Sequence, residues 1–108
     1  MPVIGIRTPS HWKKILEDSY NKRIIVDIWS KHCSPCAKFM PIYEKFSNDY
    51  PDCEFYKMSI EEMKETVKTL KITKIPTVIF IKNGEEIIDK RLSGSMTADL
   101  EYHITTHI

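Results

Sequence analysis

The stretch that decides the fold is Ile24-Ile25-Val26-Asp27-Ile28-Trp29, followed after three residues by Cys33-Ser34-Pro35-Cys36. The first segment is apolar apart from Asp27, a pattern typical of a central strand that is covered on both faces. After the second segment, bulky side chains recur at helical spacing: Phe39, Tyr43, Phe46 and Tyr50. A CxxC turn between a buried strand and a helix is a strong indication of redox chemistry in an α/β domain.

The rest of the chain alternates between helical and strand patterns. The expected order is a weak strand over 3–6, a helix opened by Thr8-Pro9, the strand over 24–29, the helix after Cys36, a strand over 54–59, a helix over 62–70, a strand over 77–81, a returning antiparallel strand over 86–92 and a last helix capped by Thr97. Asn83-Gly84 predicts a hairpin turn. On the last helix, Leu100, Ile104 and Ile108 are expected to share one face. The alternation predicts a mixed sheet of five strands, or four without the N-terminal one, with helices on both faces.

Length and composition restrict the possible functions. The 108 residues are expected to form a single domain, 1–108. A net charge of +1 gives no reason to expect nucleic acid or an anionic membrane as a partner. The longest apolar run is far shorter than the roughly 18 residues that a membrane span requires. Three cysteines and no recognisable signal peptide indicate the reducing, cytoplasmic interior of a cell, and we expect a monomer.

The two cysteines of the turn suit thiol chemistry. A cysteine at the first turn of a helix lies near unsatisfied N–H groups and a partial positive charge, which favour the thiolate. Cys36, one turn after Cys33, can reach it to close a small disulfide ring. The alternative is half of a zinc site, but zinc needs four ligands and the remaining Cys53 and histidines offer no second closely spaced pair. We therefore expect no metal.

Asp27 is the second chemical signal. A carboxyl group inside an apolar central strand should have a raised pKa. Strand alternation places Asp27 on one face with Ile25 and Trp29, so it could accept the proton of Cys36 directly or through a water. The alternative is an edge strand with Asp27 in solvent.

A family resemblance is carried by six segments: Val26-Asp27-Ile28-Trp29, Cys33-Ser34-Pro35-Cys36, Pro41, Lys57, Ile75-Pro76-Thr77 and Lys82-Asn83-Gly84. In their order and spacing these resemble thioredoxins over nearly the whole chain. The resemblance implies a thioredoxin fold, with the CxxC turn packed beside a loop in which the bond before Pro76 is cis. On the residues alone a trans bond would be expected, because only about one X–Pro bond in twenty is cis.

The same resemblance implies the roles of individual residues. Cys33 would be the exposed nucleophile and Cys36 the resolving thiol. Asp27 would be the proton acceptor, with Lys57 moderating its pKa. The substrate-binding surface would include Trp29, His32, Ser34, Pro35, Ile75, Pro76 and Ser93-Gly94, with the backbone of Ile75 pairing with the bound segment.

Two positions depart from the family pattern. Thioredoxins usually carry Trp before the first cysteine and Gly after it, where this chain has His32 and Ser34. The loss of the Trp removes an aromatic wall from the substrate surface. A protonated His32 would favour the thiolate further, or the ring points into solvent. Pro35 is retained, which in this family accompanies reducing behaviour.

The function expected from this set is reduction of protein disulfides by dithiol exchange. The expected partners are disulfide-containing proteins and a separate reductase of the thioredoxin-reductase type, and no bound cofactor is expected. A disulfide oxidase or isomerase stays open because of His32 and Ser34. So does a binding module that uses the cis-Pro groove without turnover. A glutaredoxin is less well supported, because no Gly-Gly pair follows the strand after Pro76.

The remaining cysteine and histidines are expected to have no redox role. Asp52 and Glu54 flank Cys53 and oppose its ionisation, so we interpret it as an unreactive thiol, with regulatory dimerisation as the alternative. The histidines at 11, 103 and 107 are expected on the surface.

Overall fold

The computed structural model describes residues 3–94 and 96–106. Its elements, in chain order, are β1 (Ile4–Ile6), α1 (Pro9–Asp18), β2 (Arg23–Trp29), α2 (Ser34–Asp49), β3 (Cys53–Ser59), α3 (Lys64–Thr69), β4 (Thr77–Lys82), β5 (Glu85–Glu86), a 3-10 helix (Ile88–Lys90), β6 (Leu92–Ser93) and α4 (Thr97–Thr106). The sheet order is β1-β3-β2-β4-β5, with β6 also paired to β4. The strands β1, β3 and β2 are parallel, whereas β4 runs antiparallel to β2, so the predicted mixed sheet is confirmed.

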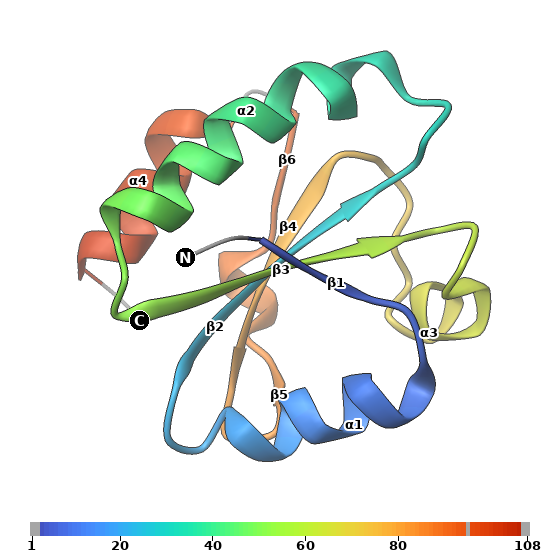
Figure 1. The fold of residues 1–108 in the computed structure, drawn as a ribbon, viewed down its shortest axis with the longest axis horizontal. Helices are drawn as coiled ribbons and strands as arrows, with labels where there is room; N and C mark the ends of the chain where they lie inside the picture. The colour runs from blue at the N-terminus through green and yellow to red at the C-terminus, as the bar shows by residue number, and fades with distance from the viewer. Residues whose placement is uncertain (1–2, 95, 107–108) are drawn as a thin grey trace.

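The sheet separates two hydrophobic cores. Figure 1 shows α1 and α3 on one face of the sheet and α2 and α4 on the other. The core under α1 and α3 contains the even-numbered apolar residues of β2, which are Ile24, Val26 and Ile28. Ile25 packs into the core that holds the buried face of α2 and α4. The predicted alternation of β2 is therefore confirmed, and it places Asp27 on the α2 side.

Local signals at helix and strand ends also agree with the prediction. The Thr8 hydroxyl accepts the His11 amide at 3.1 Å and caps α1. Asn83 and Gly84 have φ of 54° and 83°, the backbone that a tight hairpin turn requires. On α4, Leu100 and Ile104 are buried as expected, while Ile108 lies outside the described residues.

The prediction of one continuous strand over 86–92 is wrong. Ile81 pairs with Glu86, and a continuous strand would place residue 89 opposite Val78. Instead Val78 pairs with Leu92, because three residues are looped out around the 3-10 helix Ile88–Lys90. Within residues 3–94 and 96–106 the sheet consequently has six strands, two of them only two residues long.

Tertiary hydrogen bonds explain the interruption. The Arg91 guanidinium donates to the carboxylate of Glu86 at 2.7 Å. It also donates to the Leu70 carbonyl at 2.8 Å and the Lys71 carbonyl at 3.1 Å, at the end of α3. These bonds satisfy carbonyls that a helix end leaves free, and they hold the strand out of register.

None of the helices in the described ranges is long and apolar enough to cross a membrane.

Candidate active site

The two cysteines of the turn are joined by a disulfide at the start of α2, with their Cα atoms 5.2 Å apart. Cys33 is the N-cap residue of the helix, and its sulfur accepts the Cys36 amide at 3.2 Å. Cys36 is 1% exposed, whereas Cys33 is only half-buried. An incoming group therefore reaches Cys33 first, at a place where the helix N-terminus favours negative charge on sulfur.

Asp27 is fully buried in the centre of β2, between Lys57 on β3 and Val78 on β4. The strand has a neighbour on each side, so the alternative of an edge strand is wrong. Within the described residues, neither carboxylate oxygen of Asp27 has a hydrogen-bond partner. Burial raises the pKa of Asp27 to about 7, and the charge of Lys57 acts in the opposite direction. The predicted rise in pKa is confirmed, and the residue titrates in the range where proton transfer at neutral pH is effective.

Lys57 connects Asp27 to a small cavity beside the cysteines. Its ammonium lies 5.5 Å from the centre of the Trp29 ring. Both residues line a cavity of about 190 Å³ together with Cys36 and Met40. Trp29 therefore lies on the inner side of the CxxC turn, next to Cys36.

The predicted substrate-binding residues gather at one end of the sheet. The bond between Ile75 and Pro76 is cis, as the resemblance implied. Thr77 pairs with Ile28 on one side and with Ser93 on the other. The loops that leave these strands thus bring together the CxxC turn, the cis-Pro loop and Gly94. In these loops the side chains of His32, Ser34 and Pro35 are exposed, Ile75 is half-buried and Pro76 is buried.

A hydrogen-bonded cluster beside the turn was not predicted. Glu61 accepts hydrogen bonds from the hydroxyl groups of Ser30 and, at 2.8 Å, Ser59. The Ser30 hydroxyl accepts the His32 amide at 3.1 Å. The hydrogen bonds that Glu61 accepts, that from Ser30 first and then that from Ser59, lower its pKa to about 2. The sequence does not reveal this cluster, because the cluster depends on the register of β2 and β3. That register pairs Trp29 with Ser59 and so brings Ser30 and Ser59 to neighbouring strand ends.

Glu61→Gln should loosen the loop that carries Lys31 and His32. Ser30 and Ser59 donate to different oxygens of Glu61, and in glutamine one of these atoms is replaced by an amide nitrogen that only donates, so one of the two bonds is lost. We expect several-fold faster hydrogen exchange at the His32 amide and a lower midpoint of denaturation by urea. The neighbouring Glu62→Gln, which removes only a 3.8 Å surface ion pair with Arg7, is the matched control. Equal exchange rates in both variants would show that Glu61 does not hold this loop.

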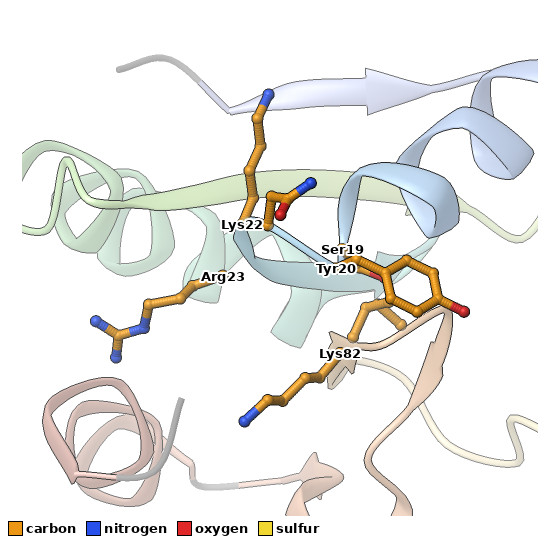
Figure 2. A pocket seen from close by; sticks show the side chains of 7 residues that line it. Ser19, Tyr20, Lys22, Arg23 and Lys82 are labelled. Carbon is orange, nitrogen blue, oxygen red and sulfur yellow. The ribbon is translucent and has the colours of Figure 1, made fainter.

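A cavity of about 430 Å³ lies at the opposite end of the sheet, where β2 begins. In Figure 2 the side chain of Lys22 points to the opposite side from those of Arg23 and Lys82. Lys22 pairs with Glu54 at 3.1 Å and Arg23 with Asp52 at 2.8 Å. The cavity therefore has no convergent set of reactive groups.

The other predicted non-catalytic residues are more buried than expected. Cys53 is 1% exposed, and burial raises the pKa of its thiol, in agreement with an unreactive group. His11 and His103 are half-buried rather than on the surface, each edge-on to an aromatic ring. His107 lies outside the described residues. In the described ranges, no group of three or more His, Cys, Asp or Glu side chains is arranged to hold a metal ion.

Comparison with known proteins gives a consistent result over the length of the chain. The sequence model of the thioredoxin family matches residues 3–106. Thioredoxin-2 of Saccharomyces cerevisiae is 31% identical over 106 residues, which cover 98% of this chain and 99% of that protein. Thioredoxin H4 of Arabidopsis thaliana is 32% identical over 108 residues, covering 97% and 89%.

Solved structures show the same similarity. The Schistosoma mansoni thioredoxin has a TM-score of 0.89 at 30% identity, covering 99% of this chain and 96% of that one. The thioredoxin NaTrxh from Nicotiana alata also has a TM-score of 0.89, at 28% identity, covering 99% and 95%. The arrangement of sheet and helices is therefore the thioredoxin fold.

Proposed function

This chain belongs to the thioredoxin family, and we propose that it reduces disulfide bonds in other proteins through Cys33 and Cys36. The observation that carries the proposal is the cysteine pair itself. Its two members form a disulfide across the first turn of α2, one half-buried and the other almost fully buried. That arrangement suits one sulfur for attack on a partner and the other for the second step.

The first step is attack by the Cys33 thiolate on one sulfur of the target disulfide. A bond forms between Cys33 and that sulfur, the target S–S bond breaks, and the other target sulfur leaves as a thiolate. The helix N-terminus supports the attacking charge, as does the Cys36 amide 3.2 Å from the Cys33 sulfur.

The second step releases the target. Cys36 transfers its proton to the Asp27 carboxylate, and its thiolate attacks Cys33. The bond to the target breaks, so the target leaves with both sulfurs reduced while Cys33 and Cys36 are oxidised by two electrons. Lys57, opposite Asp27 in the sheet, keeps part of the carboxylate population ionised at neutral pH by lowering its pKa.

The surface that holds the target is proposed to include the loops gathered around Cys33. Its members are Trp29, His32, Ser34, Pro35, Ile75, Pro76 and Gly94. The backbone of Ile75, next to the cis bond, would pair with an extended target segment. Thioredoxins generally act on disulfide substrates and are reduced by thioredoxin reductase. We propose a reductase of that type as the electron donor of this chain. The chain itself would act as a monomer, with residues 1–108 forming one domain. It would work in the cytoplasm and bind no cofactor.

Reduction of insulin by dithiothreitol tests the proposal. The protein should accelerate it catalytically, and the potential of the Cys33–Cys36 pair should lie near the about −270 mV of thioredoxin. A potential closer to the about −120 mV of a strong disulfide oxidant would identify an oxidase instead. If the wild-type protein does not accelerate insulin reduction, the reductase proposal fails and the alternative of a binding module without turnover is favoured.

A further inference from the structure

The two chain segments that carry the CxxC turn and the cis-Pro loop contain basic residues but no acidic ones after Asp27 and Glu65 respectively. The sequence contains no Asp or Glu from 28 to 43, the segment with the CxxC turn, and none from 66 to 84, the segment with the cis-Pro loop. Lys31 lies in the first segment and Lys74 in the second, and both side chains are exposed. In the part of the chain that the structure describes, neither lysine forms an ion pair with an acidic side chain.

The nearest carboxylates offset these charges only in part. Asp27 is fully buried. Glu61 is ionised, since its pKa is lowered, and its hydrogen bonds from the neutral hydroxyls of Ser30 and Ser59 leave that negative charge in place. In the described residues it forms no ion pair with Lys31 or Lys74, and Glu62 pairs with Arg7 at 3.8 Å. The chain as a whole has a net charge of only +1, so the positive field at this end of the sheet is a local property.

The two lysines also line two hollows near the end of β2. Lys31 lines the cavity of about 190 Å³ that contains Cys36 and Trp29. Lys74 lines a second, mainly apolar cavity of about 270 Å³ with Ile60 and Ile75. The Ile60 amide donates to the Trp29 carbonyl at 2.9 Å, which places this second hollow next to the end of β2. A peptide segment that pairs with Ile75 would therefore pass between Lys31 and Lys74.

We propose that the preferred targets are protein segments with acidic side chains beside the disulfide-bonded cysteine. This inference rests on the proposed reductase activity and names its substrate class. Opposite charge on target and enzyme accelerates encounter and fixes the register of the segment, while the apolar lining beside Lys74 accommodates a neighbouring hydrophobic side chain. The acidic residues would lie within reach of Lys31 on one side and Lys74 on the other.

A pair of disulfide peptides provides the test. The two peptides differ only in the residues beside each cysteine, which are Glu in one and Lys in the other. The measured quantity is the second-order rate constant of their reduction by the reduced protein, divided by the rate constant for dithiothreitol. This division removes the intrinsic effect of the flanking charges on the disulfide. We expect the acidic peptide to be favoured roughly tenfold at 0.1 M ionic strength and much less at 1 M, where the Debye length falls to about 3 Å.

Charge reversal then assigns the preference to residues. Lys31→Glu and Lys74→Glu should each lower the acidic-to-basic ratio about threefold, and the double variant should bring it close to one. Because both peptides meet the same Cys33, the ratio is insensitive to any change in the reactivity of that thiol. The control is Lys82→Glu, which has the same change in net charge but lies at the far end of β4, in the region drawn in Figure 2. Five residues of strand, about 17 Å, separate Lys82 from Thr77 beside the cis-Pro loop.

The outcomes separate this proposal from the proposed function. A ratio near one in the wild type, with insulin still reduced, overturns the acidic preference and leaves the reductase standing. If Lys82→Glu lowers the acidic-to-basic ratio as much as Lys31→Glu and Lys74→Glu do, the assignment of the preference to Lys31 and Lys74 is overturned. Failure to reduce insulin and both peptides overturns the reductase and the preference together.

Discussion

Cys33→Ser is expected to abolish catalysed disulfide reduction, by at least about a thousandfold, because no other described sulfur can make the first attack. Cys36 is almost completely buried behind Cys33, and Cys53 is buried in β3 with a raised thiol pKa. A serine hydroxyl is far less acidic than a thiol and does not form a stable bond with a target sulfur. The measurement is insulin reduction under single-turnover and steady-state conditions.

The companion variant Cys36→Ser should lose turnover for a different reason. Its Cys33 still attacks, so one target sulfur is released and the target stays bound to Cys33 as a mixed disulfide. Mass spectrometry of the non-reduced mixture should show this species in Cys36→Ser and not in Cys33→Ser. Cys53→Ala, which removes the thiol outside the turn, should retain turnover. A mixed disulfide on Cys36 in the Cys33→Ser variant would reverse the proposed order of attack.

The strand and turn around Cys33 could be predicted from sequence because their signals are local. An apolar run with one acid at Asp27 indicates a central strand wherever it occurs, and the cysteine spacing has meaning only within one helical turn. The cis bond before Pro76 is different. Local energetics favour a trans bond, so the cis bond that is observed could be predicted only from the resemblance to thioredoxins.

Two of the features that sequence analysis missed depend on contacts between distant segments. The break at Ile88–Lys90 is held by Arg91, which bonds to carbonyls at the end of α3 some twenty residues earlier. The bond between Ser30 and Glu61 requires β2 and β3 in a known register. Neither contact leaves a periodic pattern in the chain, and serine and glutamate are common in exposed loops. Tertiary register, rather than propensity, determined both outcomes.

Asp27→Asn should change the pH dependence of stability. The pKa of Asp27 is about 7 in the folded protein against an ordinary value of 3.8, so the folded state retains a proton that the unfolded chain has lost. Wild-type stability is therefore full below about pH 4, falls as the pH rises to about 7, and is constant above it. The shift corresponds to a loss of about 4 kcal/mol across that window. Asparagine does not ionise, so its side chain adds no such pH dependence. The free energy of unfolding of the variant, minus that of the wild type, should therefore rise by about this amount from pH 4 to pH 8.

Urea denaturation at several pH values measures this difference, and Asp89→Asn on the exposed 3-10 helix is the matched control. The control also loses one aspartate, but at a site in contact with solvent. A stability difference between Asp27→Asn and wild type that does not vary from pH 4 to pH 8 would contradict the raised pKa.

The same substitution should slow release of the target without slowing the first attack. Asp27 lies on the side of the sheet that α2 covers, the helix that carries the buried Cys36, and general-base assistance contributes on the order of a hundredfold or more. In the wild type only the ionised carboxylate accepts a proton, so the rate of mixed-disulfide decay should rise with pH through about 7 and level off above it. In Asp27→Asn the decay should be about a hundredfold slower and the inflection absent, while formation of the mixed disulfide by Cys33 is little changed. Rapid-quench measurement of both steps separates them. Decay at the wild-type rate in Asp27→Asn would show that the proton of Cys36 leaves by a route that does not involve this carboxylate.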